Sequence, residues 1–155
     1  MSQTNASQYG AVAFVGMLAD MSDNDILSYA AEGAVAIGRT VRLGTNKEKQ
    51  VIQSGTGVGQ GALVVGFSVH DHAREQNSAG LVQYADKETV SVKKRGRIWV
   101  ETNDAVVAGT VANLHLATGK FTDEAVAAGI EAITQVTVRF VTGTTGAGLA
   151  IVEIK

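Results

Sequence analysis

The 155-residue chain has no cysteine and no proline, and only 5% of its residues are aromatic. The absence of cysteine excludes disulfides, thiol nucleophiles and cysteine metal sites. Without proline, the turns depend on the 18 glycines, which reach backbone conformations of positive φ at little cost. A core made mostly of alanine and valine buries little apolar area per residue. We therefore expect burial between subunits to supplement it.

Charge is also scarce: 18% of the residues are charged, 45% are hydrophobic, and the net charge is −2. This balance is typical of a globular domain and gives no reason to expect a nucleic-acid partner. The first ten residues lack the basic and apolar regions of a signal peptide. No uncharged apolar run approaches the roughly 18–20 residues of a membrane span, so we expect no membrane partner.

From residue 34 onward, short runs of alternating apolar residues are separated by glycine-bearing turns. About nine such runs at intervals of roughly 8–12 residues predict a mainly all-β fold, a compact β-barrel or β-tulip-like domain. Residues 1–10 are polar and aperiodic, which favours an extended arm. We predict an N-terminal arm over residues 1–30 and a β-barrel domain over residues 31–155. Weak helical patterns cover residues 26–31 and 123–132.

Two motifs suggest chemistry but lack its full pattern. The glycine cluster Gly55–Gly61 leads into a predicted strand, whereas a nucleotide-binding loop leads into a helix. His70 and His72 would share a strand face, but no third ligand has a fixed relation to them. No Gly-x-Ser-x-Gly elbow occurs. We predict that the protein is not an enzyme and has no catalytic residues, no metal and no cofactor.

The densest positive charge lies in Lys93-Lys94-Arg95-Gly96-Arg97, read as a turn between two strands. Two interpretations stay open: contact with an acidic partner surface, or protection of an exposed strand edge against aggregation. Trp99 alternates with Ile98 and Val100, which puts it on a mixed face. It is either a half-buried cap over the end of the barrel or an anchor at an interface.

Residues 62–121 contain a series of short motifs in a set order: Val65-Gly66-Phe67-Ser68-Val69, Asp71, Val90-Ser91-Val92, Arg95-Gly96-Arg97-Ile98-Trp99-Val100, Asp104-Ala105-Val106, Ala108-Gly109 and Thr118-Gly119-Lys120-Phe121. With these motifs, the stretch resembles the head decoration, or structural cement, proteins of tailed bacteriophages. Upstream, Gly16-Met17-Leu18-Ala19-Asp20, Glu32-Gly33 and Ile37-Gly38 follow the same order, so the likeness spans most of the chain.

The resemblance implies a small β-barrel domain with an N-terminal arm that binds the outer face of an icosahedral head. Such proteins cross seams between subunits of the major capsid protein and stabilise the shell against internal genome pressure. The implied location is the virion surface, after synthesis in the host cytoplasm. A symmetric homo-oligomer lets each subunit use the same patch at a symmetry axis, and we favour a trimer over a dimer.

The residues expected at the capsid or subunit interface come from the arm and the basic stretch. They are Tyr9, Phe14, Met17, Leu18, Lys93, Lys94, Arg95, Arg97 and Trp99. One alternative is a carbohydrate- or receptor-binding module of the virion surface, such as a head fibre base, which would need clustered aromatics. A less favoured alternative is a small trimeric β-barrel enzyme such as a trimeric dUTPase. Its C-terminal phosphate-binding arm has no counterpart, because residues 143–148 (GTTGAG) precede a predicted strand.

Overall fold

The computed structural model describes residues 13–21, 23–55, 57–71, 73 and 82–155. Their structure is almost wholly β, as predicted. The strands are β1 (Asp25–Ala31), β2 (Val35–Ala36), β3 (Thr40–Leu43), β4 (Gln50–Gln53), β5 (Val64–Ser68), β6 (Gln83–Tyr84), β7 (Thr89–Glu101), β8 (Asn113–His115), β9 (Lys120–Thr122), β10 (Ile130–Ala132), β11 (Val138–Phe140) and β12 (Leu149–Ile154). A single 3₁₀ turn, η1 (Gly61–Leu63), precedes β5. No helix among these residues is long and apolar enough to cross a membrane.

Five strands close into a barrel, which confirms the predicted fold class. They follow the order β1-β4-β3-β5-β7, and β7 pairs again with β1. The pairing of β1 with β4 is parallel, while β1 and β7 are antiparallel. The barrel and the short β2–β6 pair share one buried apolar cluster. It consists of Ala31, Val35, Ile37, Val41, Val51, Tyr84, Val90 and Val92.

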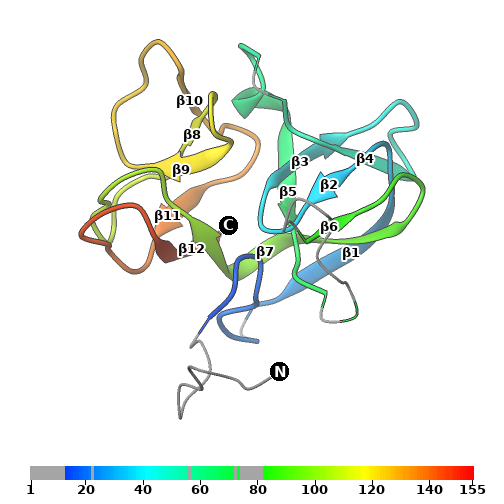
Figure 1. Cartoon of the computed structure of the whole chain (residues 1–155), viewed down its shortest axis with the longest axis horizontal. Helices are drawn as coiled ribbons and strands as arrows, with labels where there is room; N and C mark the ends of the chain where they lie inside the picture. Colours follow the sequence, from blue (N-terminus) through cyan, green and yellow to red (C-terminus); the bar gives the residue numbers. More distant parts are fainter. Residues whose placement is uncertain (1–12, 22, 56, 72, 74–81) are drawn as a thin grey trace, which may run out of the picture.

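β7 is shared by two halves of the molecule. Its first part, up to Arg95, pairs with β1, and its second part, from Gly96 to Glu101, pairs with β12. Figure 1 shows β1–β6 on one side of β7, and β8–β10 with β11 and β12 on the other. A second, larger apolar cluster lies mainly in this other half, with Ile98, Phe121, Phe140 and Val152, and also includes Phe67 of β5. Because one strand runs through both halves, the two cores are mechanically connected.

The basic stretch is part of a continuous strand, so the predicted turn at residues 93–96 is wrong. Asp25 pairs with Arg95 while Ile26 pairs with Lys93, so Lys94 is an extra residue in β7. Such a bulge bends a strand without ending it. Gly96 has φ of +104° at the point where β7 changes partner. The sequence pattern of a turn is therefore produced here by a bulge and a glycine bend.

Both weak helix predictions are also wrong. Residues 26–31 lie in β1, where pairing with β7 overrides local propensity. The stretch 123–132 contains a turn at Gly129, with φ of +86°, followed by β10. β1 thus begins within the residues that the sequence pattern gave to the arm. The division of the chain at residue 30 stays a prediction.

Candidate capsid-binding surface at the junction of the two halves

Residues 13–21 and 23–24, here called the strap, follow the second part of β7. Gly16 N donates a hydrogen bond to Trp99 O (2.7 Å), and Trp99 N donates one to Met17 O (2.9 Å). Ala19 N donates to Arg97 O (3.1 Å). This part of β7 therefore lies between β12 and the strap. The strap is the deep-blue segment below β7 in Figure 1.

Two glycines let the strap pass close to the barrel. Gly16 and Gly38 have φ of +76° and +69°, and a Cβ on Gly16 would lie 2.9 Å from Gly38 N. His70 N donates to Gly16 O (2.7 Å), and Gly38 N donates to Ser68 O (2.9 Å). The strap is thus fixed both to β7 and to the end of β5. Its course depends on glycine where the two backbones cross.

Opposite charges join the strap to β7. Arg95 Nε lies 3.0 Å from Asp23 Oδ2, and Arg97 Nη1 lies 3.3 Å from Asp20 Oδ2. Arg97 Nε also lies 3.3 Å from Glu153 Oε1 on β12. The acidic run 20–25 and the basic run 93–97, which the sequence presents separately, are partners. Exposed pairs of this kind contribute about 0–1 kcal/mol each.

These ion pairs bear on both interpretations of the basic stretch at residues 93–97. Arg95 and Arg97 are already neutralised within the chain, which weakens the hypothesis of an acidic partner surface. β7 has β1 and β5 beside its first part, and β12 and the strap beside its second. Among the described residues, β7 is therefore not an exposed edge strand, and its charges are not needed to protect such an edge against aggregation. The geometry assigns these arginines to holding the strap.

The two lysines of the stretch face different surroundings. Lys93 has no exposed surface, and its ammonium donates a hydrogen bond to Asn24 Oδ1. Burial lowers the pKa of Lys93, and the negative charge of Asp20 partly opposes this shift. The expectation that Lys93 faces a partner is at odds with this burial. Lys94 Nζ lies 5.3 Å from the centre of the Tyr29 ring, at cation–π distance.

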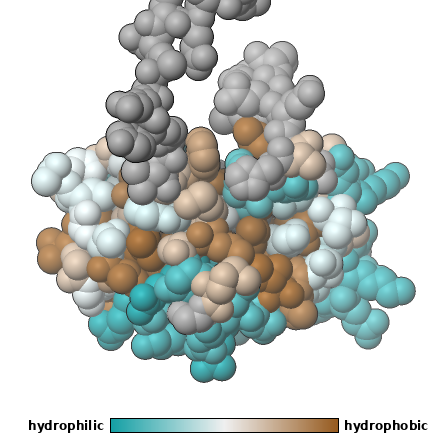
Figure 2. Space-filling view, turned by 90° about the horizontal axis from the view of Figure 1, so that it is seen from below, coloured by the Kyte–Doolittle hydropathy of each residue, from teal (hydrophilic) through white to brown (hydrophobic). Residues whose placement is uncertain are grey.

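Four of the predicted apolar interface residues lie in the strap or on the second part of β7, a region here called the junction. Phe14 is 48% exposed and stacks on His70 with 5.8 Å between ring centres. Met17, Leu18 and Trp99 are half-buried, and Leu18 forms a β-bridge to Ile98. Figure 2 shows the domain from below, with apolar side chains across the middle of this face. Another predicted interface residue, Tyr9, lies outside the described residues, and the binding role of the group stays a prediction.

The glycine loop before β5 binds a carboxylate of the chain itself. Gly61 N donates to Glu131 Oε2 (2.8 Å), and Gly59 N donates to Glu131 Oε1. Gly55 N donates to Gln60 Oε1 (3.0 Å). The amides that would hold a phosphate are therefore occupied by the side chain from β10. The loop joins the barrel to the other half of the molecule, a role that sequence spacing gave no means of finding.

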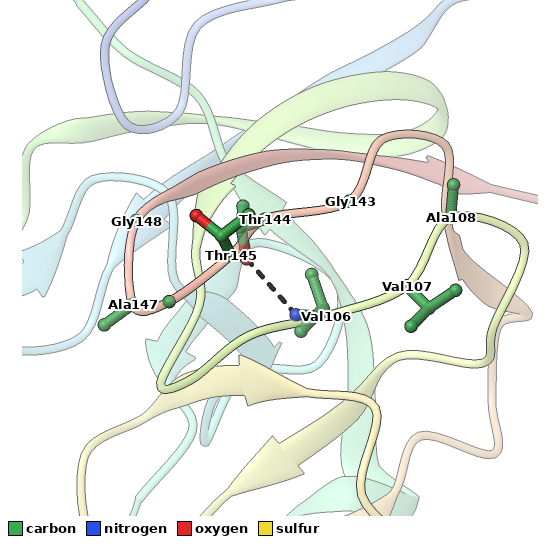
Figure 3. Close-up of a pocket in the computed structure, with 9 residues that line it drawn as sticks. Val106, Val107, Ala108, Gly143, Thr144, Thr145, Ala147 and Gly148 are labelled. Carbon is green, nitrogen blue, oxygen red and sulfur yellow. Dashed lines mark hydrogen bonds between the residues drawn. The ribbon is translucent and has the colours of Figure 1, made fainter.

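A broad, open depression of about 740 Å³ lies at the outer end of the second half (Figure 3). Residues 106–108 form one wall and residues 143–148 the other. The walls meet where Val106 N donates to Thr144 Oγ1 (3.2 Å). All 9 lining residues are valine, alanine, glycine or threonine, so none can act as an acid or base near neutral pH. Among the described residues, no three His, Asp or Glu side chains gather as a metal site.

The relation to known proteins agrees with a surface built for contact. Residues 2–155 match the model of the family described as "Structural cement protein (E217 gp24/Pam3 gp6)". The chain belongs to this family. As a structural cement protein of phage, it is part of the capsid, where it decorates and stabilises the shell. The resemblance in the sequence is thereby confirmed, and the receptor-binding alternative is not favoured.

A solved structure shares the fold of this cement protein. It is a chain from "The capsid of Myoviridae Phage XM1", with a TM-score of 0.69 and 16% sequence identity. The alignment covers 96% of this chain and 93% of that chain. At this identity the likeness concerns the fold. No curated protein matches the chain.

Proposed function

We propose that the strap and residues 1–12 are the part of this cement protein that binds the major capsid protein, across a seam between subunits on the outer face of the shell. The supporting observation is the hydrogen bonding of Gly16, Met17 and Ala19 to β7. It gives the residues ahead of the strap a fixed starting point on the domain. Phe14, half-exposed beside that point, offers an apolar contact.

Chain length makes such a bridge feasible. Twelve residues, when extended, reach up to about 40 Å. A segment that becomes ordered on binding can cover a large surface at modest affinity. An N-terminal segment rooted at the junction can thus reach one capsid subunit while the domain rests on another.

The cement protein also acts, in this proposal, as a symmetric homo-oligomer, with a trimer favoured over a dimer. Copies around a symmetry axis add weak contacts through effective concentration. The half-buried Trp99 at the junction is a suitable anchor between copies. The proposed role is structural and requires no catalysis, cofactor or nucleic acid.

Truncation tests the proposed binding segment. Removing residues 1–12 leaves the hydrogen bonds of Gly16, Met17 and Ala19 intact, so the domain should stay folded with the native fluorescence of Trp99. Binding to purified expanded shells should weaken about tenfold or more, which corresponds to at least about 1.4 kcal/mol. Co-sedimentation over a range of protein concentrations measures it.

Two further chains complete the experiment. A chain with residues 1–12 in scrambled order separates the effect of sequence from that of length. A chain lacking residues 1–18 loses the strap as well, and should both bind poorly and change its Trp99 emission. Decoration at wild-type affinity by the chain lacking residues 1–12 would contradict the proposal.

A further inference from the structure

A buried lysine and an asparagine side chain meet where the strap enters β1. Lys93 is among the largest fully buried side chains of the described residues. On β7 it pairs with Ile26 of β1 and Phe67 of β5. Directly paired residues project on the same face of a sheet, so apolar side chains flank Lys93 on both sides. Its Nζ atom reaches the side-chain amide of Asn24.

This is an unusual environment for a charged ammonium. A buried charge normally has a counter-charge in direct contact, because desolvation otherwise costs several kcal/mol. The hydrogen-bond acceptor of Lys93 among the described residues is a neutral amide oxygen. Desolvation lowers the pKa of Lys93, which favours the free amine, the nucleophilic form of lysine.

Packing around Nζ is close. A Cβ on Gly96 would lie 2.9 Å from Lys93 Nζ and 2.7 Å from Asp23 O. Only glycine at this position leaves the amine its place beside Asn24. Bulge, glycine and strap together hold the amine and the amide against each other, an arrangement that raises the effective concentration of two reacting groups.

We propose that Lys93 and Asn24 react to form an intramolecular isopeptide bond between Nζ and Cγ. The lone pair of the neutral amine attacks Cγ, the Nζ–Cγ bond forms, and the Cγ–Nδ2 bond breaks. Nδ2 leaves as ammonia and takes up the proton that Nζ gives up. One amide replaces another, so the step needs no oxidant, reductant or activated co-reactant.

The proton must pass from Nζ to the leaving group, and Asp20 is the candidate carrier. The negative charge of Asp20 acts on Lys93, and Arg97 holds the same carboxylate at 3.3 Å. We assign the proton transfer to Asp20. Replacing it should slow the reaction without removing either reacting group.

The bond would attach the strap covalently to β7. It joins positions 69 residues apart, one just before β1 and the other in the strand that runs through both halves. Tension on the N-terminal segment would then pass directly to β7. It would add a covalent attachment to the hydrogen bonds and ion pairs that already join the strap to that strand. The inference depends on these contacts and not on which surface binds the capsid.

High-resolution mass spectrometry of the intact, denatured protein tests the proposal. The measured mass of the wild type should be lower than the mass calculated from its sequence by one molecule of ammonia. A proteolytic digest should contain a branched peptide that joins residues 24 and 93. Lys93→Met keeps an unbranched apolar side chain and should have the full mass. Lys94→Met, the matched control at the neighbouring lysine, should retain the loss of ammonia. Asp20→Asn should leave a larger unreacted fraction.

One side reaction must be distinguished. Asn24 precedes Asp25, and cyclisation of an asparagine onto its own backbone also releases ammonia. That loss would persist in Lys93→Met and would give no branched peptide. The proposal is overturned if the wild type has its full mass, or if Lys93→Met loses ammonia to the same extent.

Discussion

Glu32 ties the end of β1 to the loop after β3. Its carboxylate accepts hydrogen bonds from Thr45 N (2.5 Å) and Thr45 Oγ1 (2.8 Å). These bonds, the backbone one first, lower the pKa of Glu32 below its ordinary value of 4.5. A carboxyl whose pKa is lower in the folded state stabilises the fold above the unfolded pKa. That contribution disappears as the pH falls through the folded pKa.

Glu32→Gln should therefore lower stability at neutral pH and matter less in acid. The melting temperature of the wild type should exceed that of the variant at pH 7, and the difference should shrink below pH 4.5 as Glu32 becomes protonated. Thermal unfolding followed by circular dichroism, from neutral pH to about pH 3, measures it. A difference that stays constant over this range would assign the effect to packing and not to charge.

At the scale of elements, the position of the strap depends on close backbone contacts with β7 and the barrel. Gly16 of the strap crosses close to Gly38 of the barrel half, and both glycines have a left-handed backbone conformation. A Cβ on Gly38 would lie 2.8 Å from Gly16 N, and backbone atoms cannot move aside as a flexible side chain can. The crossing thus has two requirements for glycine, one of conformation and one of space.

Gly38→Ala should loosen the strap and destabilise the domain by about 1–3 kcal/mol, since a non-glycine residue there is strained. The chain has one tryptophan, Trp99, whose backbone hydrogen-bonds to the strap, so we expect its emission to change when the strap detaches. Gly57→Ala is the matched control, because a Cβ there meets nothing within 4 Å. Unchanged emission and stability in Gly38→Ala would show that the crossing tolerates a side chain.

At the scale of the whole molecule, β7 joins the two halves, and the larger apolar cluster extends from the second half to Phe67 of β5. The first half pairs through β1 and β5, and the second through β12. The strap lies along β7 at the junction, where Trp99 is half-buried and available to another surface. Contact with a second copy at this junction would bear on both halves at once.

Trp99→Ala should weaken self-association or shell binding more than it unfolds the domain. A fully buried tryptophan would cost about 3–5 kcal/mol of stability on truncation, and a half-buried one should cost less. Sedimentation velocity over a range of concentrations measures the first effect, and chemical unfolding the second. A variant that unfolds far more readily yet assembles at wild-type affinity would place Trp99 in the core and the interface elsewhere.

The sequence by itself determined the β class, many of the turns and the last strand. A strand was predicted directly after residues 143–148, and β12 (Leu149–Ile154) lies there. Glycine-bearing turns were predicted between the strands, and Gly119 has φ of +65° between β8 and β9. These features are local: strand periodicity and glycine conformation are properties of a few consecutive residues. The family resemblance, carried by ordered motifs, could likewise be read without coordinates.

Only the tertiary structure decided which of these segments meet. The acidic run that includes Asp20 and Asp23 and the basic run that includes Arg95 and Arg97 are oppositely charged in sequence, yet nothing local says that they pair. Lys93 was expected at the surface and is buried, because a bulge, the strap and two neighbouring strands surround it. Periodicity tells which face of a strand a residue occupies. What covers that face depends on chain closure over some 70 residues, and that is settled by packing of the whole fold.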